Sequence, residues 1–136
     1  MTLIAQATTA LLALFDQECP REQFPFAQFL AYQAEDFTSP MEEGLSLYLF
    51  KVDITADPRQ GRTLFLSYLL TAWSPDPLRQ QELLGWALRI VQGTAVLDQL
   101  LRLEILPLTI ADLSAVWSMA RTGAQPSVAL MIRGRD

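Results

Sequence analysis

Residues 63–73, TLFLSYLLTAW, hold no charged residue, and apolar side chains fill both sides of the strand that they predict. With the two-residue period of a strand, one side carries Leu64, Leu66, Tyr68, Leu70 and Ala72, and the other carries Phe65, Leu69 and Trp73. A strand with two apolar sides needs cover on both faces of its sheet. Other elements of this 136-residue chain, or other chains, must therefore pack on both faces of the sheet.

A second strand is predicted over residues 45–55, LSLYLFKVDIT. In strand geometry Tyr48, Phe50, Val52 and Ile54 share one face, and the leucines between residues 45 and 49 begin the other. The residues between the two strands, ADPRQGR, contain Asp-Pro and Gln-Gly, which are typical of a turn. Two long strands joined in this way predict an antiparallel hairpin.

Three helices are predicted from the 3.6-residue apolar period and from the residues at their ends. They span about residues 2–17, 77–92 and 110–120, and the second follows Asp76 as its N-cap. Gly85 lies inside the second helix, where glycine costs about 1 kcal/mol relative to alanine. Such a glycine indicates that a neighbouring backbone comes close.

Further strands are predicted at about residues 27–34, 100–108 and 127–135. The order of elements indicates the α/β (α+β) class and one domain over residues 1–136. We expect a single mixed sheet of four to five strands flanked by about three helices. These helices suffice to cover one sheet face well and the second face only in part.

The composition leaves the chain short of charge for its outer surface. Apolar residues make up 51% and charged residues 18% of the sequence, against about 45–50% and about 25% in a typical soluble domain. Composition alone leaves open whether the helices cover every apolar side chain in a monomer or whether some apolar side chains finish their burial against neighbouring chains. The candidates are the aromatic residues Phe24, Phe26, Phe29, Tyr32, Phe65 and Trp73.

The net charge of −5 is unevenly distributed, with −7 in residues 1–57 and +2 in residues 58–136. An acidic chain is a poor nucleic-acid binder, because phosphate contacts require clustered Lys and Arg. This uneven charge has two interpretations. It favours a head-to-tail contact between copies, or the charges only keep the loops hydrated. Arg59 and Arg62 flank the hairpin turn and have the same two interpretations, an acidic partner or a hydrated loop.

The sequence contains no catalytic or metal-binding pattern. It has no histidine, the commonest general base and metal ligand, and no glycine-rich phosphate-binding motif. Glu35-Asp36 and Glu42-Glu43 are interpreted as solvated loop acids, and the single Cys19 as an unreactive thiol that is at least half-buried. We expect no cofactor and no enzyme activity.

No segment reaches the ~20 apolar residues of a membrane-spanning helix. The first 15 residues are uncharged, but they lack the positive region of a signal peptide and follow a helical stripe. We therefore expect an amphipathic helix of the fold, with no signal peptide and no direct membrane insertion.

Six short motifs occur in an order that resembles a known family. They are LSLYLF (45–50), SYLLTAW (67–73), LLGWAL (83–88), VLD (96–98), LSAVW (113–117) and QPSVAL (125–130). With the opening helix, they resemble the N-terminal domain family of the cap, or tail-terminator, proteins of extracellular contractile injection systems. These are phage-tail-like particles with a sheath around an inner tube. The resemblance covers about residues 45–131 and does not include residues 20–44.

The resemblance implies a mixed sheet flanked by helices and a structural role without catalytic residues. It implies a six-fold ring on the end of the tube and sheath distal to the baseplate, which stops elongation and anchors the last sheath layer. The implied partners are further copies, the tube protein, the sheath protein and a second, related cap subunit, with assembly in the cytoplasm as part of the particle. Two alternatives stay open: an adaptor that binds one protein as a monomer or dimer, and a small histidine-free α/β enzyme.

Overall fold

The computed structural model describes residues 2–59, 61–98, 101–120 and 125–136. The elements in chain order are α1 (Leu3–Glu18), β1 (Gln28–Ala31), the 3-10 helix η1 (Ala34–Thr38), β2 (Gly44–Asp57), β3 (Gly61–Trp73), α2 (Pro77–Gln92), β4 (Val96–Asp98), β5 (Leu101–Leu106), α3 (Ile110–Met119) and β6 (Ser127–Arg135). The predicted helices and strands are confirmed to within a few residues. The strand β4 was not predicted, because three residues are too few to show an alternation.

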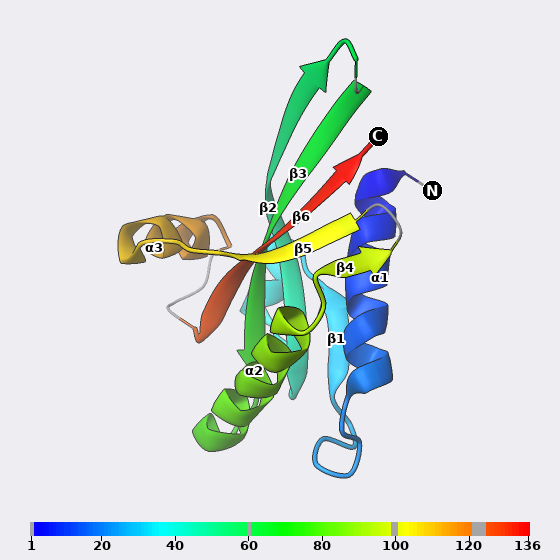
Figure 1. The fold of residues 1–136 in the computed structure, drawn as a ribbon. Helices are drawn as coiled ribbons and strands as arrows, with labels where there is room; N and C mark the ends of the chain where they lie inside the picture. The colour runs from blue at the N-terminus through cyan, green and yellow to red at the C-terminus, as the bar shows by residue number, and fades with distance from the viewer. Residues whose placement is uncertain (1, 60, 99–100, 121–124) are drawn as a thin grey trace.

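The strands form one six-stranded sheet in the order β1-β2-β3-β6-β5-β4 (Figure 1). β1 is parallel to β2, and the other neighbouring strands are antiparallel. The predicted class, a mixed sheet flanked by helices, is confirmed, with six strands in place of four to five. The predicted hairpin is β2–β3, and β3 lies inside the sheet between β2 and β6.

The first face of the sheet is covered by α1 and α2 (Figure 1). One buried cluster joins residues of β3, α1 and α2, among them Leu66, Tyr68, Leu70, Leu11, Phe15, Leu83 and Ala87. Each of these side chains is at most 1% exposed. Burial of a large apolar side chain stabilises the fold by about 1.5–3 kcal/mol, so this layer is the main core.

A smaller cluster covers one end of the second face. It joins Tyr32, Phe37, Trp73 and Ala120, with Met41 and Tyr48 packed against them. The ring centroids of Phe37 and Trp73 are 5.8 Å apart, and Trp73 Nε1 donates to Ser46 Oγ at 2.9 Å. The second face is thus covered only in part, as predicted, by η1 and by the residue that follows α3.

A β-bulge at Phe50 reverses the faces of β2. The residues on either side of Phe50 pair with successive residues of β3, so Phe50 is an extra residue in the ladder. Beyond it, Val52 and Ile54 lie on the opposite face from Tyr48. The prediction that these four residues share one face is wrong, because an inserted residue shifts the two-residue alternation by one position.

Candidate interaction surfaces

The part of the chain that the structure describes contains no group of three or more Cys, Asp or Glu side chains able to hold a metal ion. In that same part, no helix has the length and apolar character needed to cross a membrane. Cys19 is buried, as expected for an unreactive thiol, and burial raises its pKa.

Three of the predicted interface aromatics are buried within the chain itself. Phe24 is 1% exposed and lies under the guanidinium of Arg79, whose Cζ is 5.0 Å from the ring centroid. Tyr32 and Trp73 belong to the second-face cluster and are 9% and 7% exposed. Phe29 is half-buried against aromatic rings of α1 and α2. These side chains leave little area for a neighbouring chain, because the fold supplies their cover.

The remaining predicted residues lie on the surface but not at one place. Phe26 is 86% exposed and lies in the loop between α1 and β1, at the end of the molecule opposite to the hairpin turn (Figure 1). Arg59 and Arg62 are exposed at that turn, where Arg62 forms an ion pair with Asp136. Phe65 is half-buried on the second face of the sheet. The structure therefore does not gather the sequence candidates into one patch.

The hairpin tip, residues 51–59 with 61 and 62, extends beyond the rest of the sheet (Figure 1). Each of these residues is exposed, including Val52 at 40% and Ile54 at 57%. β1 pairs with β2 only as far as Leu47, so among the described residues the outer edge of β2 beyond Leu47 has no neighbouring strand. An unpaired edge with exposed apolar residues is a ready site for contact with another chain.

Glu43 and Arg79 form a connected polar contact near the base of the hairpin. The interpretation of Glu43 as a solvated acid is wrong, since its side chain is 15% exposed and Arg79 donates to both carboxylate oxygens, at 2.7 and 2.8 Å. The Arg79 hydrogen bonds lower the pKa of Glu43, and a hydrogen bond from Ser74 at 3.1 Å adds to this effect. Arg79 also donates to the Gln23 carbonyl at 3.0 Å. This contact fastens residues 20–44 to α2.

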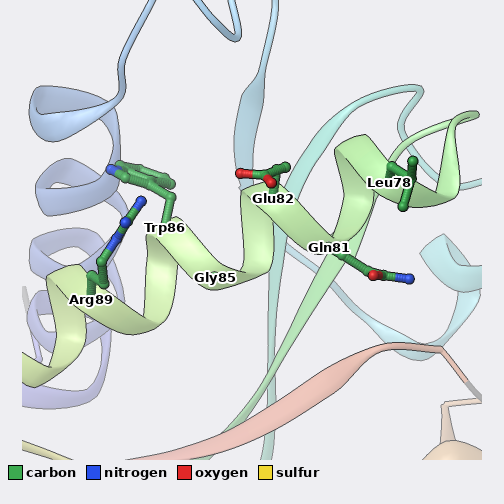
Figure 2. A pocket seen from close by; sticks show the side chains of 6 residues that line it. All are labelled: Leu78, Gln81, Glu82, Gly85, Trp86 and Arg89. Atoms are coloured by element: carbon green, nitrogen blue, oxygen red, sulfur yellow. The ribbon is translucent and has the colours of Figure 1, made fainter.

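The outward side of α2 carries a shallow pocket that sequence reasoning missed. Its volume is about 260 Å³, and it is lined by Leu78, Gln81, Glu82, Gly85, Trp86 and Arg89. Figure 2 shows Glu82 and Arg89 on either side of Gly85 along the helix, with Trp86 between them. A Cβ atom at Gly85 would meet no described atom within 4 Å, so the close backbone predicted from this glycine is not found within the described chain. In the sequence, Gly85 was the one residue that indicated an unusual feature on this side of α2.

The fold is that of the terminators of contractile injection particles. The chain matches the cryo-EM structure of an extracellular contractile injection system, the PVC sheath/tube terminator in its extended state, over 98% of its length, with a TM-score of 0.71 and 15% identity. It also matches the cryo-EM structure of the anti-feeding prophage tube-terminating cap over 98% of its length, with a TM-score of 0.67 and 13% identity. The chain spans 56% and 54% of the lengths of those two chains.

A family model described as the Pvc16 N-terminal domain matches residues 6–134, and the chain belongs to this family. No individually curated protein matches the chain. The family resemblance drawn from the six motifs is confirmed, and the match extends through residues 20–44, which the motifs did not include.

Proposed function

We propose that this chain acts as a structural cap, the tail terminator of a contractile injection system. In this role it forms a six-fold ring on the distal end of the inner tube and sheath, stops their elongation and anchors the sheath. Its partners are further copies of itself, the tube protein, the sheath protein and a related cap subunit. Assembly takes place in the cytoplasm, and the role requires contact surfaces without catalysis or a cofactor.

The observation that carries this proposal is the fold shared over 98% of the chain with two proteins described as a sheath/tube terminator and a tube-terminating cap. The surface supports it as well. The hairpin tip, Phe26 and the outward side of α2 offer exposed apolar groups at separate places. A subunit that contacts neighbours in a ring and also a tube needs several separate contact surfaces.

Deletion of the gene tests the proposal in the cells that produce the particle. Negative-stain electron microscopy of the deletion strain is expected to show tubes of uncontrolled length or tubes bare of sheath. Expression of the intact gene from a plasmid is expected to restore uniform, sheathed particles. Particles of normal length with complete sheaths in the deletion strain would contradict the proposal.

A further inference from the structure

Nothing in the described part of the chain explains why residue 85 is a glycine. It lies in the interior of α2, where alanine is the better helix former. It is exposed, and a methyl group there would meet no described atom within 4 Å. A glycine on an open helix surface lets the backbone of another chain come closer than any side chain would allow.

The charges beside Gly85 also lack partners. Glu82 and Arg89 line the same pocket, and their side chains form no ion pair with any residue that the structure describes. They are two helical turns apart, about 10.5 Å along the axis. Leu78, at the start of the same outward side, is 70% exposed. The pocket thus presents one acid and one base, with Gly85 and Trp86 between them along the helix (Figure 2).

The hairpin tip carries the complementary pair of charges. Asp57 and Arg59 are exposed at the turn, and Asp57 Oδ1 accepts a hydrogen bond from the Arg59 backbone N–H at 2.8 Å. Gly61 begins β3 on the other side of the turn with φ of +76°, a conformation that glycine adopts readily. The tip and α2 lie in different parts of the molecule (Figure 1), so the contact requires two copies.

We infer that the hairpin tip of one copy docks on the outward side of α2 in the next copy. The backbone of the tip lies against Gly85, Asp57 faces Arg89, and Arg59 faces Glu82. Each copy uses two different surfaces, which is the arrangement that closes into a ring when the rotation is right. The inference rests on the proposed cap, because it specifies how copies of that cap contact one another.

Substitution of Gly85 separates this role from a structural one. Gly85→Ala is expected to raise the melting temperature by about 3–5 °C, because alanine favours the helix. The same change is expected to weaken self-association in sedimentation equilibrium, and Gly85→Leu to weaken it about 100-fold. A stabilised protomer that associates less well is a result that a purely structural glycine would not produce.

Charge reversal identifies the two surfaces. Asp57→Arg and Arg89→Glu are each expected to weaken self-association about 10-fold. The double variant is expected to return to within about 3-fold of the wild type, because each contact again joins opposite charges. Glu42→Arg and Arg102→Glu, which are exposed elsewhere, are matched controls expected to have no effect. The same variants are also expressed in the deletion strain, and the fraction of particles with capped ends is counted by electron microscopy.

The inference is overturned if Gly85→Leu associates and caps like the wild type, or if the double variant stays as weak as the single variants. Failure of the proposed function has a different outcome. If deletion leaves the particles normal while the charge reversals behave as expected, the contact stands and the cap role is wrong. If deletion abolishes capping but all of these variants cap normally, the cap role stands and this contact is wrong.

Discussion

The two ends of the β2–β3 hairpin have similar apolar residues and opposite surroundings. At the base, Leu47 and Leu70 pair across the strands and are 1% and 0% exposed. At the tip, Val52 and Ile54 lie on the same sheet face and are 40% and 57% exposed. The difference comes from α1 and α2, which cover this face of the sheet at the base of the hairpin. An apolar alternation therefore predicts a strand, while its burial depends on elements elsewhere in the chain.

Removal of an aromatic side chain at the base should give the largest effect. Trp73→Ala is expected to lower the free energy of unfolding by about 3–5 kcal/mol in urea titration, because it empties the second-face cluster. Phe26→Ala removes an aromatic ring from the surface and is expected to change the free energy of unfolding by less than about 0.5 kcal/mol. An equal loss of unfolding free energy in the two variants would contradict the burial of Trp73 and the exposure of Phe26 described above.

The Glu43–Arg79 contact near the base of the hairpin should make the stability of the protein depend on pH. Glu43→Gln is expected to lower the melting temperature at pH 7, because Arg79 loses a charged acceptor. The folded-state pKa of Glu43 lies below the ordinary 4.5, so its contribution is present above that pH and is lost as the pH falls through the folded-state pKa. Thermal melts of both proteins from pH 7 to pH 3 should therefore converge in acid. A constant difference over this range would mean that the ionised carboxylate contributes nothing.

Truncation of Ile54 in the hairpin tip should have a small effect, in contrast to truncation of its cross-strand partner Leu64. Ile54 and Leu64 are directly paired on one face, yet they are 57% and 5% exposed. Ile54→Ala is expected to lower the free energy of unfolding by less than about 1 kcal/mol, and Leu64→Ala by about 2–5 kcal/mol. Denaturant titration of the two variants measures the difference, and a larger loss at Ile54 would contradict the burial described for the tip.

Local signals were enough to predict most of the elements. Asp76 caps α2 through its side chain, as predicted, and a Thr109 capping box opens α3. The bulge at Phe50 was not predictable in this way, because it depends on the register between two strands. The Glu43–Arg79 contact joins residues 36 apart in the chain, so no local pattern contains it.

The candidate surface was harder to predict than the fold. The aromatic residues of 24–37 suggested an interface, but Phe24 and Phe29 pack with the main core, and Tyr32 and Phe37 complete the second-face cluster. The exposed residues that remain, Phe26 and the arginines of the hairpin turn, were among the predictions. The α2 pocket was indicated only by Gly85, since charged residues on a helix surface are ordinary.

Cryo-electron microscopy of intact particles is the most direct test of the proposed cap. The account predicts a ring of density at the tube end distal to the baseplate, into which this six-stranded sheet fits with its hairpin tip against α2 of the neighbouring copy. Complete particles whose distal end lacks any density that fits this fold would contradict it.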